Sequence, residues 1–276
     1  MENIRFSIVV PVYNAAAFIV NCMESVRNQE YKNFELILVN DGSIDDSEKI
    51  IDKYKESHKE IAIIYSYQKN QGAAVARGNG LLLATGDYIA FLDADDIWYS
   101  NKLSTYYQYI INNKGTFFYG DEYEVSIDGK KEERRYRQLG DKAVIELITG
   151  SNPISTSTVV VEKNFLLKAH TFFDNKKAGE DIACWISLAK AGAKFVHIPE
   201  IVGEYRRNEK SLTMCDEEFM KETYERLLEF YDFLTEYDYS LEKINELKTN
   251  QKAKNAYSMA RFHHRRNEYK KARNYY

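Results

Sequence analysis

The first 92 residues alternate between short apolar runs and stretches in which apolar residues recur at helical spacing. The runs are rich in β-branched and aromatic residues and have the length of strands buried on both faces. They are Phe6–Val12, Phe34–Val39, Ile61–Tyr67 and Tyr88–Leu92. Helices are expected over Ala15–Gln29, through Ile50, Ile51 and Tyr54, and over Ala73–Ala84. Such alternation predicts βαβ units, and therefore an α/β fold with a mostly parallel, Rossmann-like sheet flanked by helices.

Polar residues follow each predicted strand, and the carboxyl ends of parallel strands meet at one edge of a sheet, where ligands bind. The last strand is followed within four residues by Asp93, Asp95 and Asp96. Three carboxylates so close repel one another, and a divalent cation relieves that repulsion. Oxygen ligands favour Mg²⁺ or Mn²⁺ over zinc. The alternative is an acidic loop that only caps the following helix.

Two common nucleotide-binding motifs are absent from the sequence. The first predicted strand is not followed by GxGxxG, and GxxxxGK[ST] occurs nowhere. These absences argue against a dinucleotide-binding dehydrogenase and a P-loop NTPase.

The composition is that of an ordinary globular protein whose cysteines are expected to be reduced thiols. Of its 276 residues, 44% are hydrophobic and 29% are charged, and 22 are tyrosines, which suit sugar, nucleobase or interface contacts. The three cysteines form no CxxC pair, and the N-terminus lacks the apolar core of a signal peptide. We therefore expect a cytoplasmic protein with no nucleic-acid partner.

The C-terminal segment Gln251–Tyr276 is strongly basic. It holds eight Lys and Arg residues and one acidic residue, Glu268, so its formal charge is +7. Because the net charge of the whole chain is −4, the rest of the chain carries a charge of −11. An apolar stripe of Ala256, Met259 and Ala260 accompanies it. A basic amphipathic end suits peripheral contact with anionic lipid on the inner face of the cell membrane. A solvated helix face or a homodimer contact explains it equally well.

Several motifs occur in a fixed order: VVPVYN, VNDGSIDDS, NQGAAVARGNGLLLATGDYIAFLDADD, then Gly179-Glu180-Asp181 and VGEYRRNEKS. In this order they resemble the family 2 inverting glycosyltransferases of the GT-A fold, over Ser7–Trp98 and again over Gly179–Ser211. The resemblance implies transfer of a sugar from a nucleoside diphosphate donor, UDP above all, to a hydroxyl of a glycan or lipid-linked acceptor. Mn²⁺ or Mg²⁺ would be the cofactor.

The resemblance also implies roles for residues on the donor side. Tyr13 would lie against the nucleobase, Asp41 would accept from the base or ribose, and Arg77 would face the diphosphate. Asp93 and Asp95 match the DxD pair that holds the ribose and the metal, with Asp96 helping to orient them. Further implied donor contacts are Pro11, Asn14, Asn70, Ala94 and Glu180.

Asp181 is the catalytic base that the resemblance implies. The alternative is that Glu180 and Asp181 only favour the dipole of the helix that begins there. In VGEYRRNEKS, a loop segment of the family, Asn208 stands where a histidine is common, so that it is a weaker candidate metal ligand beside Asp95. Arg206 and Arg207 are candidates for the charge of the diphosphate.

The remaining expectations concern organisation and competing functions. We expect a catalytic domain over residues 1–212 and a helical extension over 213–276. Beyond Trp98, a helix is expected at Asn101–Asn113 and strands at Phe117–Ile127 and Ile154–Glu162, with a turn at Asp128-Gly129. The absence of QxxRW and of membrane spans argues against a processive synthase. A sugar nucleotidyltransferase and a non-catalytic nucleotide-sugar-binding scaffold are the competing functions.

Overall fold

A computed structural model describes residues 3–150, 154–168, 178–208 and 217–276. Its strands are β1 (Phe6–Val12), β2 (Phe34–Asp41), β3 (Ile63–Gln68), β4 (Tyr88–Phe91), β5 (Ile97–Trp98), β6 (Phe117–Val125), β7 (Lys131–Arg134), β8 (Val160–Glu162) and β9 (Phe195–Arg206). The helices of the first half are α1 (Ile19–Arg27), α2 (Ser47–Ser57), α3 (Ala73–Leu83), α4 (Lys102–Asn112), α5 (Ala143–Thr149) and α6 (Lys163–Lys168). The later helices are α7 (Glu180–Lys190), α9 (Glu217–Phe230), α10 (Leu241–Arg265) and α11 (Tyr269–Arg273), with the 3₁₀ turns η1 (Thr156–Thr158) and η3 (Tyr231–Tyr237).

These strands form one sheet in the order β3-β2-β1-β4-β8-β6-β9-β5, with β7 paired to β6. The half built from β3, β2, β1 and β4 is parallel, as the βαβ alternation predicts. Beyond β4 the sheet is mixed, because β8 runs antiparallel to both β4 and β6, whereas β6 and β9 are parallel. The predicted α/β fold is therefore confirmed, with a parallel first half and a mixed second half.

Alternate residues of β1 serve two hydrophobic cores, one on each face of the sheet. Ile8 and Val10 belong to the core that contains residues of α1 and α4. Val9 points to the other face and belongs to the core that contains residues of α3 and Trp185 of α7. Burial of both faces explains why β1 reads as a continuous apolar run. It also explains Gly80 in α3, because a Cβ at that position would lie 2.4 Å from Val9.

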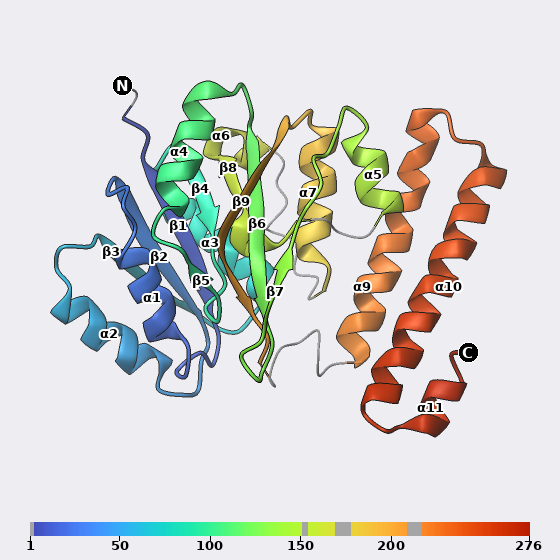
Figure 1. Cartoon of the computed structure of the whole chain (residues 1–276), viewed down its shortest axis with the longest axis horizontal. Coiled ribbons are helices and arrows are strands. Elements are labelled where there is room, and N and C mark those ends of the chain that lie inside the picture. The colour runs from blue at the N-terminus through green and yellow to red at the C-terminus, as the bar shows by residue number, and fades with distance from the viewer. Residues whose placement is uncertain (1–2, 151–153, 169–177, 209–216) are drawn as a thin grey trace.

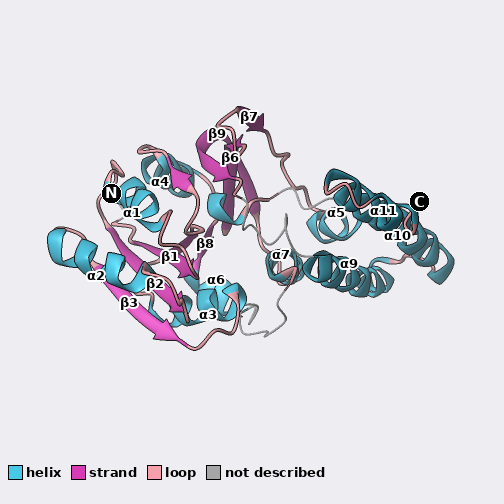
Figure 2. Ribbon diagram, turned by 90° about the horizontal axis from the view of Figure 1, so that it is seen from below, coloured by secondary structure: helices cyan, strands magenta, loops and turns pink. Residues whose placement is uncertain are grey.

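The C-terminal helices pack against the same core as the sheet. Tyr231, Leu234 and Ile244 belong to the cluster that contains Trp185. Figure 1 shows α9 beside α7, with α10 on the far side of α9 and α11 at its end. Figure 2 shows the same group, together with α5, on one side of the sheet. The proposed boundary at residue 212 lies outside the described residues, and the helices beyond it share a core with the rest of the protein.

Some local expectations differ from the structure. Ile154–Glu162 was expected to be one strand, but Thr156–Thr158 forms a 3₁₀ turn before β8. Its Ser and Thr side chains bond locally, as when the Thr158 hydroxyl donates to Ser155 O at 2.8 Å, and this competes with strand pairing. β9 was expected to be a loop where it overlaps VGEYRR, yet it pairs with β6 along its length. The turn at Asp128-Gly129 is confirmed, with Gly129 at φ +84°.

Candidate functional site

A cleft of about 1290 Å³ opens at the carboxyl ends of the parallel strands. Twelve of the fifteen residues that the sequence proposes for the site line it. They are Pro11, Tyr13, Asn14, Asp41, Asn70, Arg77, Asp93, Ala94, Asp95, Glu180, Asp181 and Asn208. Asp96, Arg206 and Arg207 are not among the described lining residues. Residues from six separate stretches of chain are thus brought to one place, as strand ends in an α/β sheet allow.

Asp41 uses both carboxylate oxygens to shape the loop before α3. Oδ1 accepts hydrogen bonds from the Gln68 side chain at 2.7 Å and from the Gln71 amide at 2.8 Å, and Oδ2 accepts from the Gly72 amide at 2.9 Å. The carboxylate is buried at 3% exposure yet still borders the cleft. Asp41 therefore holds the loop that leads into α3. A hydrogen bond from a ligand to Asp41 would add to these three bonds.

Tyr13 and Asn14, which follow β1, form a lip of the cleft. Tyr13 is 53% exposed, which leaves a face of its ring open to the cleft. Asn14 has φ +49°, a left-handed conformation that Asn tolerates, and its Oδ1 accepts from the Ile44 amide at 2.9 Å. That bond ties the turn after β1 to the loop after β2, so the lip has a defined position.

The three aspartates after β4 have different surroundings. Asp96 is 2% exposed, accepting from the Ser157 hydroxyl at 2.5 Å and from the Arg206 amide at 2.9 Å, so it fastens β9 and η1 to this loop. Asp93 and Asp95 face the cleft. Burial, and then the charge of Asp93, raise the pKa of Asp95 to about 6. A cation beside Asp95 would reverse that shift, so this carboxylate fits a divalent metal.

Asn208 contacts Asp95 directly. Its Nδ2 donates to Asp95 Oδ2 at 2.6 Å. A half turn of the amide would present its oxygen to a metal held by Asp95. Within the described parts of the chain, no group of three or more His, Cys, Asp or Glu side chains is placed to hold a metal. A site built on Asp95 therefore suits a metal that takes its other ligands from a bound phosphate.

Arg77 joins two of the predicted motifs. Its guanidinium donates to Asp93 Oδ1 at 2.6 Å and to Glu180 Oε1 at 2.9 Å, although the arginine is only 4% exposed. Its buried Nε has no hydrogen-bond partner among the residues that the structure describes. The sequence placed Arg77 against a diphosphate, and the structure shows it committed to two protein carboxylates at the wall of the cleft.

Asp181 begins α7 beside this ion-pair chain. Burial, followed by the charge of Glu180, raises the pKa of Asp181 to about 6, while Arg77 and the Ile182 amide, which donates to Oδ1 at 2.7 Å, act in the opposite direction. A carboxylate that titrates near 6 is ionised at neutral pH yet basic enough to take up a proton. Its properties match those of a general base.

Arg206 and Arg207 stand at the end of β9. The charge of Arg206 lowers the pKa of Asp95, which places this cation near the metal candidate. Arg207 instead pairs through Nε with Glu124 of β6. Residues 209–211, the rest of the VGEYRRNEKS segment, lie outside the described residues.

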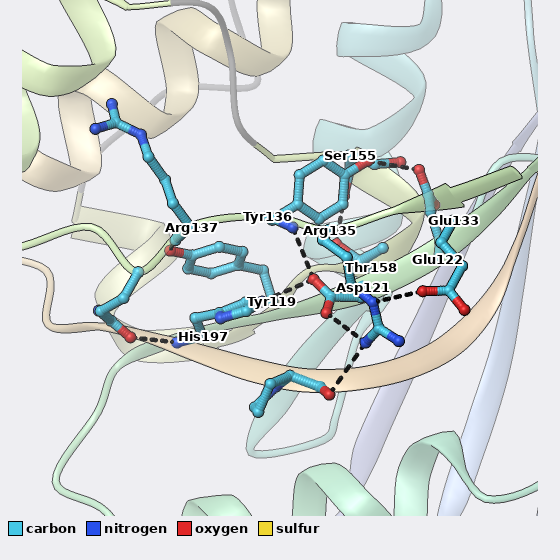
Figure 3. Close-up of polar contacts among 12 residues, drawn as sticks. Tyr119, Asp121, Glu122, Glu133, Arg135, Tyr136, Arg137, Ser155, Thr158 and His197 are labelled. Atoms are coloured by element: carbon cyan, nitrogen blue, oxygen red, sulfur yellow. Dashed lines mark hydrogen bonds and ion pairs between the residues drawn. The ribbon is translucent and has the colours of Figure 1, made fainter.

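Sequence reasoning missed a second wall of the cleft, formed by Arg134, Tyr136 and Tyr205. Figure 3 shows Asp121 of β6 between the main chain of Tyr136 and the side chains of Arg135 and His197. The Tyr136 hydroxyl donates to Glu122 at 2.7 Å. This wall depends on contacts between β6 and residues 134–136, which no spacing in the sequence reveals.

The far end of the cleft is lined by residues of α9 and α10, which the sequence also did not identify as part of a site. They are Glu218, Phe219, Glu222, Thr223, Tyr224, Leu227, Gln251, Lys254, Asn255 and Ser258. The helices that the sequence describes as an extension therefore contribute to the same cleft as Asp181.

The basic C-terminal segment has an exposed charged surface, but its apolar stripe is buried at Met259 and Ala260 and half-buried at Ala256. Met259 and Ala260 are buried, whereas Arg261, Arg265, Lys270, Lys271 and Arg273 are exposed. No helix in the described ranges is long and apolar enough to cross a membrane.

Comparisons with known proteins bear on this site. The sequence profile described as Glycosyl transferase family 2 matches residues 7–170. Three uncharacterized glycosyltransferases of Rickettsia species are 32–33% identical over 189 residues, which is 68% of this chain but 27–31% of theirs. The chain therefore spans less than a third of the length of these relatives. The amylovoran biosynthesis glycosyltransferase AmsB of Erwinia amylovora is 32% identical over 215 residues, 74% of this chain and 70% of its own.

Solved structures show the fold. The TarS fragment of S. aureus, in complex with UDP-GlcNAc, superposes with a TM-score of 0.70 at 17% identity, over 94% of this chain and 72% of its own. The mannosyltransferase PcManGT of Pyrobaculum calidifontis, with GDP-Man and Mn²⁺, has a TM-score of 0.64 at 14% identity, over 100% and 74% of the two chains. The chain has the fold of these structural neighbours, GT-A, and because the family profile covers more than half of its length, it belongs to glycosyl transferase family 2.

Proposed function

We propose that the protein transfers a sugar from a nucleoside diphosphate, with UDP as the first candidate, to an acceptor hydroxyl with inversion at the anomeric carbon. The observation that carries this proposal is a single cleft lined by three groups. They are the exposed ring of Tyr13 and the carboxylates of Asp95 and Asp181, each with a pKa raised to about 6. These are the groups needed to hold a base, a diphosphate and an attacking hydroxyl.

The donor would occupy the part of the cleft between β1 and the loop before α3. Tyr13 offers its exposed ring to the nucleobase. Asp41 keeps lone pairs toward the cleft after bonding Gln68, Gln71 and Gly72, and a uracil N3–H is a suitable donor to it. Support comes from the neighbouring structures, in which TarS holds UDP-GlcNAc and PcManGT holds GDP-Man.

The proposed cofactor is Mn²⁺ or Mg²⁺ at Asp95. The raised pKa of this carboxylate and the proximity of the Asn208 amide fit such an ion, and PcManGT was solved with Mn²⁺. When bound, the ion would neutralise charge on the leaving diphosphate. Arg206, whose charge already acts on Asp95, would add to that neutralisation.

The chemical step assigned to this chain is general-base catalysis by Asp181. Asp181 accepts the proton of the acceptor hydroxyl as its oxygen bonds to the anomeric carbon, and the bond from that carbon to the diphosphate oxygen breaks. One displacement of this kind inverts the anomeric centre. Arg77 holds Glu180, the neighbour of Asp181, and Asp93, the neighbour of the metal site, so that base and donor keep a fixed separation.

The biological setting that we propose is bacterial surface polysaccharide synthesis on a lipid-linked acceptor. The name of AmsB, an amylovoran biosynthesis glycosyltransferase, supports it. The exposed cations of α11 and of the end of α10, with Tyr257, Tyr269 and Tyr276 exposed beside them, suit peripheral contact with an anionic membrane surface.

Incubation of the purified protein with a panel of nucleotide sugars and Mn²⁺ tests the proposal. Release of the nucleoside diphosphate, dependent on Mn²⁺ and on Asp181, supports a transferase. Release of pyrophosphate would instead indicate a nucleotidyltransferase. Binding of a nucleotide sugar without any turnover would indicate a non-catalytic scaffold.

A further inference from the structure

Asp41 and Gln68 are the last residues paired between β2 and β3. Residues paired across adjacent strands point to the same face of a sheet, so their side chains can meet. Gln68 Nε2 donates to Asp41 Oδ1 at 2.7 Å, and the two residues are 9% and 3% exposed. Gln68 is therefore a buried partner of a carboxylate that lines the cleft.

The amide of Gln68 can face Asp41 in only one orientation. A carboxylate accepts hydrogen bonds and donates none, so Asp41 requires the NH₂ end of that amide. The amide oxygen, Oε1, then faces the half-buried Asn79 of α3, whose Nδ2 donates to it at 2.5 Å. Asn79 thus holds the Gln68 amide in the orientation that Asp41 needs.

The hydrogen bonds to Asp41 leave room for one more donor. Each carboxylate oxygen offers about two acceptor sites. Oδ1 uses both, for Gln68 and for the Gln71 amide, whereas Oδ2 uses one for the Gly72 amide. The other site on Oδ2 can accept an N–H of a ligand, but it repels a ligand atom that presents a lone pair.

The loops around this carboxylate lie directly against each other. Gly42, the residue after Asp41, has φ +72°, and a Cβ there would lie 2.8 Å from the Asn70 amide nitrogen. Asn70 and Asp41 both line the cleft. Because the loop after β2 is packed on the loop after β3, Asp41 has little freedom to turn toward a different ligand.

The pyrimidine bases differ at the atom that such an acceptor would meet. Uracil carries a hydrogen on N3, whereas N3 of neutral cytosine carries a lone pair. A carboxylate that is held as an acceptor bonds the first and repels the second. Sites that leave a buried polar group unpaired with the wrong ligand discriminate strongly against that ligand.

We propose that Gln68, oriented by Asn79, determines the base specificity of the donor site by keeping Asp41 an acceptor, so that the site takes uracil and excludes cytosine. Gln68 is a positioning residue, because it acts through Asp41 and is not among the described lining residues of the cleft. The inference rests on the proposed function, since it concerns the donor of the same reaction. It goes beyond that function by naming the residues that set the choice between bases.

Calorimetry of UDP and of CDP, each with Mn²⁺, measures this choice as the ratio of the two affinities. The wild type should favour UDP by about five- to a hundredfold, which is the range expected when a buried polar group is left unpaired. Equal affinities of the wild type for UDP and CDP would overturn the proposal.

Gln68→Glu replaces the amide donor with a second carboxylate of the same shape. At the 2.7 Å that separates the two side chains, a pair of carboxylates shares a proton, so Asp41 would lose part of its negative charge. Its attraction for N3–H and its repulsion of a lone pair should both weaken. The ratio of UDP to CDP affinity should therefore fall about fivefold or more.

Two further variants accompany Gln68→Glu. Lys69→Gln lowers the charge of the exposed neighbouring residue by one and should leave the ratio unchanged. Equal ratios in Gln68→Glu and Lys69→Gln would contradict the proposal. Asn79→Asp places a carboxylate at both ends of the Gln68 amide, so that the amide oxygen must face one of them, and the ratio should again fall. Asn79→Asp decides the question if Gln68→Glu does not fold, because an unchanged ratio in it would show that no relay orients Asp41.

Turnover of a panel of nucleotide sugars by the wild type separates failure of this inference from failure of the proposed function. Turnover of a UDP-sugar together with equal affinities for UDP and CDP overturns the inference alone. Turnover of another nucleotide sugar without binding of UDP also overturns it, while the proposed sugar transfer stands. Absence of both UDP binding and turnover contradicts the proposed function itself.

Discussion

Arg77 Nη1 donates to Glu180 Oε1 at 2.9 Å, across 103 positions of sequence. The other end of the guanidinium donates to Asp93, so one buried cation connects the aspartates after β4 with the start of α7. A residue in this place acts on the base and on the metal site without having to touch either substrate. We therefore describe Arg77 as a positioning residue.

Replacement of Arg77 by Met should impair turnover and destabilise the fold. Two carboxylates would lose their partner, at a cost of about 1–3 kcal/mol in the free energy of unfolding. Loss of the positive charge also raises the pKa of Asp181 further, so the rising limb of kcat should move to higher pH. Urea denaturation and pH–rate profiles measure the two effects.

Two controls separate this role from alternatives. Arg77→Lys keeps the charge and should restore part of the pH profile. Arg27→Met removes an arginine from the half-exposed pair with Glu24 on α1, far from the cleft lining, and should change stability little and leave the pH profile in place. If Arg77→Met instead loses UDP affinity while the pH profile stays in place, Arg77 contacts the diphosphate, as the sequence suggested.

Asp181→Asn should abolish the chemistry and leave the donor bound. The amide keeps the size of the carboxylate but cannot accept a proton, so turnover should fall by about two to four powers of ten. Calorimetry with UDP and Mn²⁺ should show little change. Asp141→Asn, at an exposed position, is the matched control. Turnover close to that of the wild type in Asp181→Asn would show that another group is the base.

The pH dependence of the reaction follows from the environment of Asp181. Its pKa is raised to about 6, first by burial and then by Glu180. Below that pH the carboxyl is protonated and cannot act as a base, so kcat/KM should rise with pH and level off above about 6. This rise of kcat/KM with pH should be absent from the residual activity of Asp181→Asn. A flat profile between pH 5 and 7 in the wild type would argue against Asp181.

The basic surface at the C-terminus should govern vesicle binding without affecting chemistry. A triple variant, Lys270→Glu, Lys271→Glu and Arg273→Glu, changes exposed residues only, whereas truncation from Ala260 would also remove the buried Ala260 and His263. At about 1 kcal/mol per basic residue at low salt, binding to phosphatidylglycerol vesicles should weaken more than tenfold.

The control for this surface makes the same change of net charge elsewhere. Lys49→Glu, Lys53→Glu and Lys55→Glu alter exposed lysines of α2, on the opposite side of the molecule from α11 (Figure 1). Vesicle sedimentation of the two triple variants should differ. Equal binding by both would favour a solvated or dimer-forming helix face over a membrane contact.

The first four strands could be predicted because each is buried on both faces and so forms an apolar run. β9 could not be predicted, because Pro199, Glu200 and Glu204 interrupt its apolar pattern. Its pairing partner, β6, also lies far away in the sequence. α5 and α6 have seven and six residues, too few to show helical periodicity. Short or half-exposed elements therefore depend on tertiary contacts that local pattern does not encode.

The same division applies to the site. Strand ends must converge, so the sequence could bring Tyr13, Asp41 and Asp95 together, whereas Asp181, at the start of a helix, was identified only through the family resemblance. The sequence could show that Arg77 is a cation on a helix, but not whether a ligand or a protein carboxylate pairs with it. The contributions of α9 and α10 were missed for a related reason, because helices far along the chain approach the cleft only through packing on the core of α7.

Calorimetric titration of UDP, with and without Mn²⁺, into the wild type and Asp95→Asn tests the central claim most directly. The account predicts that the wild type binds UDP with the metal and much more weakly without it. Asp95→Asn should lose more than about tenfold of the metal-dependent affinity, since even outer-sphere partners of a metal contribute about that much. Asp52→Asn, an exposed position on α2, should bind as the wild type does. Equal metal-dependent binding of UDP to Asp95→Asn and to the wild type would contradict the claim that Asp95 holds the metal. Absence of UDP binding to the wild type would contradict the claim as well.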